Sequence, residues 1–551
     1  MVKAFLFEKH MEKELAAQMK LFALILFVLT YALMIALPKH RPWVALTSAA
    51  VFLVSGIVPL ASLRQAIDFN VLLMLAGTMG TVSLFIQSQM PNRMAEMILK
   101  KTPNVMWVAV AMSLFAGVVS AFVDNVATVL MIAPVGLAIA KKLGISPVAM
   151  LISIAVSSNL QGAATLVGDT TSIMLGGYAG MDFLDFFFMD GKASIFFAVE
   201  LGALATVPVI MFLFRKHREP VNAAVETAVT DYFPTFLLLA NIVLLITASF
   251  IPGKPALTNG FICTGLFLVG AVQSLIRGRG DRTGARTALL EIDYQTLCLL
   301  AGLFVVIAGI TNAGIIDEIS NFFVKLGGNN LFLLYTVIVW GSVLISAFVD
   351  NIPYVATMLP VVSGIALSMN CPPTVLYFGL LTGATLGGNL TPIGASANIA
   401  AIGILRKEGY EVSTGDFMRI GIPFTLVAVS TGYLSPSLSL KDSKYQGGLS
   451  VSSLLMLRKS LFRISIAGDY FGTTTSHLDI DRLSSEELIK NAVRQQYENL
   501  KSDFSRYELS IVWNRPLNHT FTLSTDIGWQ HCRFRNHNYS DRITVGCSLK
   551  F

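Results

Sequence analysis

Long apolar segments, separated by short polar stretches, run through most of the chain. Segments near or above the length needed to cross about 30 Å of hydrocarbon recur between residues 21 and 434. Two of them, 126–140 and 352–369, each follow a polar break inside otherwise apolar sequence. Backbone that leaves the helix at membrane depth persists only where protein or a water-filled cavity satisfies its polar groups. The pattern therefore predicts an all-α polytopic membrane protein with helical hairpins and broken helices.

An internal duplication organises these segments. The hexapeptide Ser-Ala-Phe-Val-Asp-Asn occurs at residues 120–125 and again, unchanged, at 346–351, an offset of 226. The same offset pairs, in order, Pro134 with Pro360, Gly162 with Gly388, Thr165 with Thr391 and Gly168 with Gly394. Repeated halves whose helices break at corresponding places are typical of secondary transporters built on inverted-topology repeats. We expect the two halves to have inverted topology.

The boundaries of the halves follow from the same pattern. We predict an N-terminal segment at 1–20, a first repeat at 21–218, a linker at 219–232 and a second repeat at 233–435. Asp68 and Asp293 each precede an apolar helix at corresponding positions and are expected to cap these helices. Between 87 and 103 the sequence is better suited to an amphipathic helix in the membrane interface.

Composition agrees with this body and separates it from the tail. Apolar residues make up 54% of the chain and charged residues only 13%, against about 25% in soluble domains. From about residue 436 the chain is more densely charged, with a helix expected at 483–507. Three stretches, 507–513, 520–529 and 542–551, alternate polar and apolar residues with the period of strands. We predict that 436–551 is an appended α+β tail with no part in transport.

Two Asp-Asn pairs, Asp124–Asn125 and Asp350–Asn351, stand between apolar stretches. An ionised Asp inside a bilayer costs several kcal/mol, so such residues usually pair, protonate or bind a cation. A carboxylate and an amide carbonyl together could bind Na⁺, and the duplication places the two pairs face to face across the pseudo-two-fold axis. The simpler interpretation is that each Asp caps the second helix of a hairpin. Both interpretations can hold, and the repetition favours a functional role.

A second pair of polar motifs follows each hairpin by about forty residues, at 157–172 and 383–398. Gly, Pro, Thr and Asn in otherwise apolar spans predict an unwound stretch. There, freed carbonyls bind cations, and the N-terminus of a half-helix attracts anions. Close packing of small residues explains the glycines equally well but not the acid and amide side chains. The candidate binding residues of these motifs are Ser158, Asn159, Thr165, Gly168, Asp169, Asn389, Thr391, Pro392, Gly394 and Asn398.

The sequence lacks the motifs that are typical of several other classes of protein. The sequence contains no Gly-x-x-x-x-Gly-Lys-Ser/Thr phosphate loop and no His-Glu-x-x-His, so neither a primary pump nor a zinc protease is expected. The basic residues form short clusters between apolar runs, as in loops beside membrane helices, and do not indicate nucleic-acid binding. No cofactor is expected beyond H⁺ or Na⁺ as coupling ion.

Residues 20–435 resemble the ion transporter superfamily, which includes arsenite permeases, the melanosomal P protein, D-type sodium–proton antiporters and citrate transporters. The resemblance rests on the motifs at 122–134, 348–360, 165–172 and 387–398. Asp replaces the Ser that the superfamily's sodium symporters carry at both hairpin tips, and Thr170-Thr171-Ser172 replaces a common Pro-Pro-Asn. The resemblance implies a scaffold part, a mobile transport part, alternating access and a homodimer, with a bacterial inner-membrane location expected.

The expected function is a secondary active transporter for an ion or small anion, coupled to H⁺ or Na⁺. A cation–proton antiporter of the same superfamily is the alternative, because the core offers carboxylates and few Lys or Arg residues. An intramembrane enzyme is a remote alternative, and a channel would not need two opposed hairpins.

Overall fold

The computed structural model describes residues 2–142, 144–189, 192–220, 228–277, 283–327 and 330–440, together with five strands between 446 and 550. The chain divides into two compact units, Met1–Gly432 and Tyr433–Phe551, and each is described by itself. Of the predicted linker at 219–232, residues 221–227 lie outside the described part of the chain.

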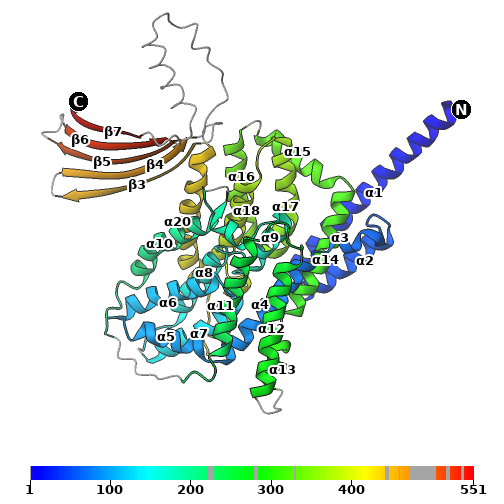
Figure 1. Ribbon diagram of the computed structural model, residues 1–551, viewed down its shortest axis with the longest axis horizontal. Helices are drawn as coiled ribbons and strands as arrows, with labels where there is room; N and C mark the ends of the chain where they lie inside the picture. Colours follow the sequence, from blue (N-terminus) through cyan, green and yellow to red (C-terminus); the bar gives the residue numbers. More distant parts are fainter. Residues whose placement is uncertain are drawn as a thin grey trace, which may run out of the picture. The chain divides into compact units, whose positions relative to one another are not determined.

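The first unit is built of helices apart from one short pair of strands, β1 (Phe188–Met189) and β2 (Lys192–Ala193) (Figure 1). Up to the middle of the chain the principal helices are α1 (Val2–Ala36), α2 (Arg41–Val54), α3 (Leu63–Ala66), α4 (Phe69–Gln87), α5 (Met90–Leu99), α6 (Val105–Ser120), α7 (Asn125–Lys142), α8 (Val148–Gly162), α9 (Thr170–Ala179) and α10 (Ile195–Leu213). The remainder are α11 (Phe233–Ser249), α12 (Thr258–Arg277), α13 (Thr283–Leu290), α14 (Tyr294–Asn312), α15 (Ile315–Gly327), α16 (Leu331–Ser346), α17 (Asn351–Ser368), α18 (Thr374–Gly387), α19 (Ser396–Lys407) and α20 (Thr414–Leu440).

Seven of the described helices are long and apolar enough to cross a membrane, or up to eight spans if a bent pair is counted as one. The first candidate span, Ala17–Ala36, is the second part of α1, which begins at Val2. The predicted N-terminal segment 1–20 is therefore continuous in secondary structure with the first span. The expected all-α polytopic membrane fold is confirmed.

The duplication is visible in how corresponding helices begin. Asp68 accepts a hydrogen bond from the Val71 amide at 3.1 Å, and Asp293 accepts one from the Thr296 amide at 3.0 Å. These contacts confirm the two predicted N-caps of α4 and α14. Asn104 and Asn330, which are separated by the repeat offset of 226 residues, cap α6 and α16 at 3.1 Å each. Equivalent side chains thus satisfy equivalent free amides in both halves.

Helices exchange partners between the halves. α4 of the first half packs against α12, and α14 of the second half packs against α2. Gly77 on α4 permits this approach, because a Cβ there would lie 2.3 Å from the backbone carbon of Cys263. Gly302 on α14 plays the same part, since its Cβ would lie 2.7 Å from the backbone of Ala45. Such reciprocal packing is what a two-fold relation between the halves produces.

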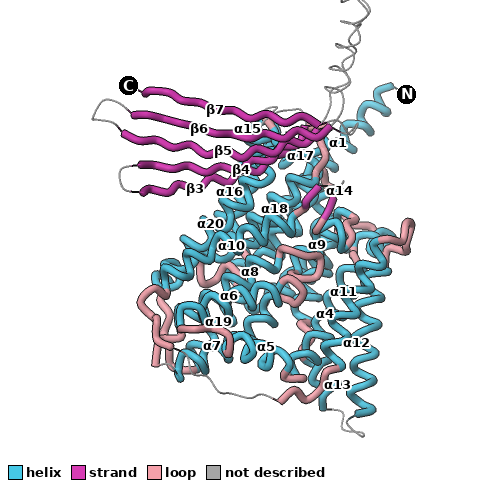
Figure 2. The backbone as a smooth tube through the Cα atoms, turned by 60° about the vertical axis from the view of Figure 1, so that its left-hand side comes forward, coloured by secondary structure: helices cyan, strands magenta, loops and turns pink. Residues whose placement is uncertain are grey.

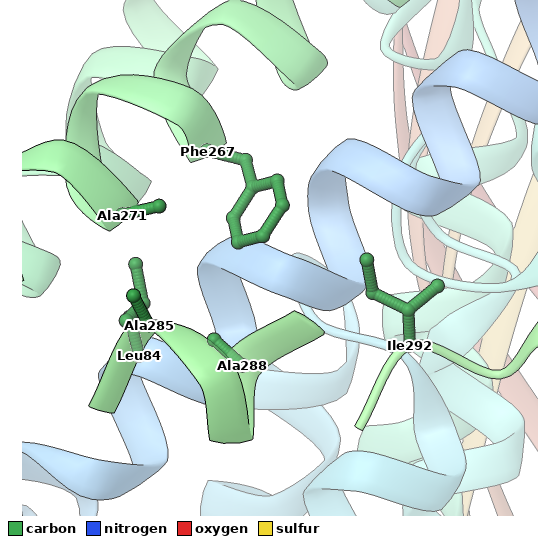
Figure 3. Packing of buried hydrophobic residues seen from close by; sticks show 6 residues of the cluster. All are labelled: Leu84, Phe267, Ala271, Ala285, Ala288 and Ile292. Carbon is green, nitrogen blue, oxygen red and sulfur yellow. The ribbon is translucent and has the colours of Figure 1, made fainter. Parts of the chain in front are cut away.

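A small apolar cluster closes the α4–α12 contact at one end (Figure 3). The ring of Phe267 on α12 lies against α4, and Gly80 on α4 leaves room for it, because a Cβ there would be 2.5 Å from the ring. The residues of the cluster come from α4, α12, α13 and the turn before α14: Leu84, Phe267, Ala271, Ala285, Ala288 and Ile292. Burial of these side chains fixes the start of α14 against the first half.

The second unit contains one antiparallel sheet with the order β3-β4-β5-β6-β7, drawn in magenta in Figure 2. Its strands are β3 (Gln446–Leu457), β4 (Ser460–Phe471), β5 (Phe504–Pro516), β6 (Thr522–Phe534) and β7 (Tyr539–Lys550). Three of them correspond to predicted strands, but β3 and β4 were not predicted. The helix expected at 483–507 lies outside the described residues up to 503, and its last residues belong to β5, so that part of the prediction is wrong.

Candidate functional site

The two hairpin turns carry the repeated Asp-Asn pairs. Asp124 stands between α6 and α7, and its Oδ2 atom accepts hydrogen bonds from the Val126 amide at 3.0 Å and the Ala127 amide at 3.2 Å. Asp350 stands between α16 and α17, and its Oδ1 atom accepts one from the Ile352 amide at 3.1 Å. Each carboxylate therefore caps the second helix of its hairpin. Capping uses only part of the acceptor capacity of a carboxylate.

The two broken helices are held to these turns by matching contacts. The Thr165 hydroxyl donates to the Ala121 carbonyl, and the Thr391 hydroxyl donates to the Ala347 carbonyl. Both acceptors belong to the repeated hexapeptide. These two hydroxyl groups thus donate their protons to join each broken helix to its hairpin turn. Their oxygens can still accept a hydrogen bond or bind a cation.

Gly168 and Gly394 lie in the unwound parts of the two broken helices, at the points where these pass very close to other backbone. A Cβ at Gly168 would lie 2.6 Å from the Gly162 carbonyl oxygen, and one at Gly394 would lie 2.6 Å from the Gly388 carbonyl oxygen. No side chain fits at these distances. These two candidate positions therefore require glycine for packing, whatever else they do.

Four asparagines from both halves form a buried hydrogen-bonded cluster. The Asn159 amide donates to Oδ1 of Asn389 at 2.7 Å and to Oδ1 of Asn398 at 3.0 Å. The Asn125 amide donates to Oδ1 of Asn159 at 3.0 Å. The cluster joins α7 and α8 of the first half to the broken helix of the second.

The outer members of this asparagine cluster are also satisfied. The Asn389 amide donates to the Val156 carbonyl at 3.0 Å, and the Asn398 amide donates to the Gly388 carbonyl at 2.9 Å. The Ser158 hydroxyl donates to the Asn125 carbonyl at 3.1 Å. A buried polar network that is satisfied in this way fixes one geometry, because every unmade bond would carry the full cost of desolvation.

Asp169 lies just before α9 and is 4% exposed. Its Oδ2 atom accepts a hydrogen bond from the Thr171 hydroxyl at 2.9 Å, and that hydroxyl lies 3.2 Å from the Thr385 hydroxyl of the second half. Its neighbour Gly168 lies against the backbone of Ser120 and Ala121 at the first hairpin, and α9 packs against α17, the helix that Asp350 caps. Three of the predicted acids therefore share one region of the molecule.

Asp350 also forms an ion pair. Its Oδ2 atom lies 2.8 Å from the guanidinium of Arg41, the first residue of α2. The sequence pattern alone assigns no role to Arg41. No local pattern could have revealed this partner, because the two residues are 309 positions apart.

The remaining candidates are less engaged. Asn351 is buried, but its side chain forms no hydrogen bond with the described residues, unlike its counterpart Asn125. Pro392 is half-buried in the break before α19. Sequence reasoning also missed Thr171 and Thr385, whose hydroxyls meet between the halves. The only indication in the sequence was that both threonines lie within the polar motifs at 157–172 and 383–398.

The site is asymmetric although the scaffold repeats. The position equivalent to Asp169 in the second half is Ala395, and the position equivalent to Asn398 in the first half is Ser172. The first half thus contributes the additional acid, and the second half contributes the additional amide. Carboxylate, amide and hydroxyl oxygens suit a proton or a hard cation such as Na⁺, whereas amide N–H groups and the N-terminus of a half-helix suit an anion.

Comparison with known proteins agrees with this architecture. The sequence profile of a family described as citrate transporter matches residues 25–383. The chain belongs to the citrate transporter family. The match includes both hairpin turns and the first broken helix, and it ends inside α18.

Two relatives resemble this chain over most of its length, and a solved transporter structure has a similar fold. A 46 kDa membrane protein of Mycobacterium leprae is 30% identical over 427 residues, which cover 75% of this chain and 97% of the relative. The human P protein is 27% identical over 497 residues, which cover 73% of this chain and 58% of that protein. The fold resembles the YdaH transporter of Alcanivorax borkumensis, with a TM-score of 0.51 and 13% identity over 77% of this chain and 97% of that one. The chain is thus a membrane transporter of the citrate transporter and P protein type, with an ion or small solute as substrate.

A second profile covers the end of the chain. A family of unknown function (DUF6850) matches residues 395–551, from the start of α19 through the sheet. The transporter match and this second match do not overlap.

Proposed function

We propose that this protein is a secondary active transporter that moves a small ion or anion by alternating access and is driven by H⁺ or Na⁺. The observation that supports it is the meeting of two hairpin turns and two broken helices around three carboxylates and a buried asparagine cluster. A buried acid in a membrane protein is costly, and it is usually retained because a proton or cation binds there.

The coupling ion has its strongest candidates in Asp124 and Asp169. Both have carboxylate oxygens beyond those used in their hydrogen bonds, and neither forms an ion pair with the described residues. Asn125 lies beside Asp124, and its side-chain oxygen adds a neutral ligand of the kind that Na⁺ accepts. Na⁺ at the Asp-Asn pairs, Asp350–Asn351 included, remains our prediction.

An anionic substrate would be bound differently. The broken helices restart at Thr170 and at Ser396, where free amides and the helix dipole favour negative charge. Asp169 offsets this effect at the first restart, whereas Ala395 leaves it intact at the second. The second half is therefore the better place for a carboxylate or oxyanion. The family's description makes citrate a natural first test ion.

A cation–proton antiporter is the second candidate, and the excess of acids supports it. Asp124, Asp169 and Asp350 share one region, where Arg41 is the ion-pair partner of one of them among the described residues. Under this alternative the acids exchange H⁺ for a metal cation and no anion moves. For both candidates we propose that the protein is a homodimer in a bacterial inner membrane and has no enzymatic activity.

The decisive experiment is flux in proteoliposomes that contain the purified full chain. Citrate, arsenite, Na⁺ and K⁺ are offered in turn under separately imposed pH and Na⁺ gradients, with protein-free liposomes as control. We expect one of them to accumulate against its own gradient only while one of the imposed gradients is present. Accumulation of citrate or arsenite supports the leading proposal, and pH-driven Na⁺ or K⁺ flux alone supports the antiporter. Flux that only dissipates gradients would refute both.

A further inference from the structure

The corner between α1 and α2 binds the second hairpin through an arginine. Arg41 donates from its Nε atom to the Met34 carbonyl at 3.2 Å and from one terminal nitrogen to Oδ2 of Asp350 at 2.8 Å. The Arg41 side chain is 22% exposed and that of Asp350 is 12% exposed. The contact to Met34 fixes the guanidinium at the end of α1, so the ion pair is held by a positioned cation.

The same corner makes a second connection to the second hairpin. The Tyr31 hydroxyl on α1 donates to the Pro353 carbonyl at 2.8 Å and also contacts the Thr357 hydroxyl. Pro353 and Thr357 lie in the first two turns of α17, directly after Asp350. The α1–α2 corner, defined here by Tyr31 and Arg41, therefore holds the start of α17 at three points.

The first hairpin has no such partner among the described residues. Asp124 accepts hydrogen bonds from two backbone amides, and neither Asp124 nor Asp169 forms an ion pair with the described residues. The hairpin aspartate is repeated in both halves, but its arginine partner is not. The carboxylates of Asp124 and Asp350 therefore offer different surroundings to a cation.

We propose that Arg41 is a positioning residue that competes with the coupling cation for the Asp350 carboxylate. The inference rests on the proposed function. Arginine stays charged at every working pH, so a proton or Na⁺ can bind Asp350 fully only by displacing the guanidinium. Besides Arg41, the titratable groups around this turn are Asp169, Tyr31 on α1 and Tyr354 on α17. Only Arg41 among them carries a positive charge.

Competition has a direct consequence for coupling. Asp350 is paired with a tethered cation in this conformation, whereas Asp124 has no cationic partner among the described residues. Occupation of Asp350 by the coupling cation therefore requires release of the Arg41 side chain, one of the three contacts between the second hairpin and the α1–α2 corner. Ion binding thereby weakens the attachment of the second hairpin to this corner.

The test compares wild type, Arg41→Gln and the matched control Lys20→Gln. Lys20 also lies on α1 and pairs with Glu318 at 2.6 Å, away from the hairpin, so its loss removes a charge without touching Asp350. An opposite charge within about 4–6 Å changes the affinity of a carboxylate for a proton by about one to three powers of ten. We expect Arg41→Gln to lower the half-saturating H⁺ or Na⁺ concentration for flux at least about tenfold. Lys20→Gln should leave it unchanged, and Arg41→Lys should stay near wild type.

A binding readout separates the two proposals. Thermal unfolding of each purified full-length variant is titrated with NaCl against choline chloride and, separately, with pH. Arg41→Gln should be stabilised at lower Na⁺ concentration, or its proton-linked change should move up by about one pH unit or more, because one unit equals a tenfold change in proton affinity. If Arg41→Gln does not insert, Arg41→Met, which also keeps an unbranched side chain without the charge, is measured, and it should show the same shift. Unchanged titrations in the available variant overturn the role of Arg41 even if wild type transports. Absence of gradient-driven flux in wild type overturns the proposed function even if the titrations shift.

Discussion

The pair of substitutions Asp124→Asn and Asp350→Asn tests the hairpin carboxylates, and the structure predicts different outcomes for their stability. Asn has nearly the size of Asp, and its side-chain oxygen can accept the same backbone amides. At Asp124 those are the amides of Val126 and Ala127, at 3.0 and 3.2 Å. Asn and Asp are comparable helix N-caps, so Asp124→Asn should change the free energy of unfolding by no more than about 0.5 kcal/mol.

The second substitution also removes an ion pair. Asp350→Asn keeps the bond from the Ile352 amide but leaves Arg41, which is 22% exposed, without its partner at 2.8 Å. A charged group that loses its partner in a partly buried place costs roughly 1–3 kcal/mol. The two variants, equivalent in the repeat, should therefore differ in melting temperature, with Asp350→Asn the less stable.

Transport should respond to both. A neutral amide can neither release a proton at working pH nor offset the charge of a bound cation in a low-dielectric site. We expect each variant to lose at least about tenfold in coupled flux, equivalent to about 1.4 kcal/mol. Melting in detergent and flux in proteoliposomes, measured on the same preparations, separate the two effects.

One result would refute this reasoning. If both variants transport at wild-type rates with unchanged pH and Na⁺ dependence, the hairpin carboxylates are caps only. The coupling site would then lie in the stretches 159–169 and 389–398. Loss in only one variant would agree with the asymmetry of the acids and amides around the two breaks.

Three further outcomes follow from the packing. Gly168→Ala and Gly394→Ala should each lower the free energy of unfolding by roughly 1–3 kcal/mol or more and abolish flux, because the added Cβ would lie 2.6 Å from a carbonyl oxygen. Gly341→Ala, where a Cβ meets nothing within 4 Å, is the control, and equal melting temperatures of all three variants would contradict the argument. Asn159→Leu should cost roughly 2–4 kcal/mol in thermal unfolding, since two buried side-chain oxygens lose their donor; a stable variant would show that the cluster is not essential. Removal of 441–551, after the end of α20, should leave flux per inserted molecule intact, and its loss in well-folded truncations would make the tail integral.

The sequence by itself determined the class of fold and the location of the turns and breaks. The offset of 226 predicted that the segments around Asp124 and Asp350 would share one backbone conformation, and both carboxylates cap the helices that follow them. Caps and breaks are set by residues a few positions apart, so a local pattern is sufficient to locate them. The strands β3 and β4 were not predicted, and the stretch 483–507, which was expected to be a helix, ends in strand.

Only the tertiary structure decided which of these local features meet. Asn159 and Asn398 bond across 239 positions, and Arg41 and Asp350 pair across 309. Neither distance along the chain has a period or a motif, because such contacts depend on how whole helices pack. The repeat in sequence predicts equivalent hairpins, whereas packing against α1 and α2 pairs Asp350 with a cation that Asp124 lacks among the described residues. The permanently charged guanidinium of Arg41 therefore makes the surroundings of Asp350 different from those of Asp124.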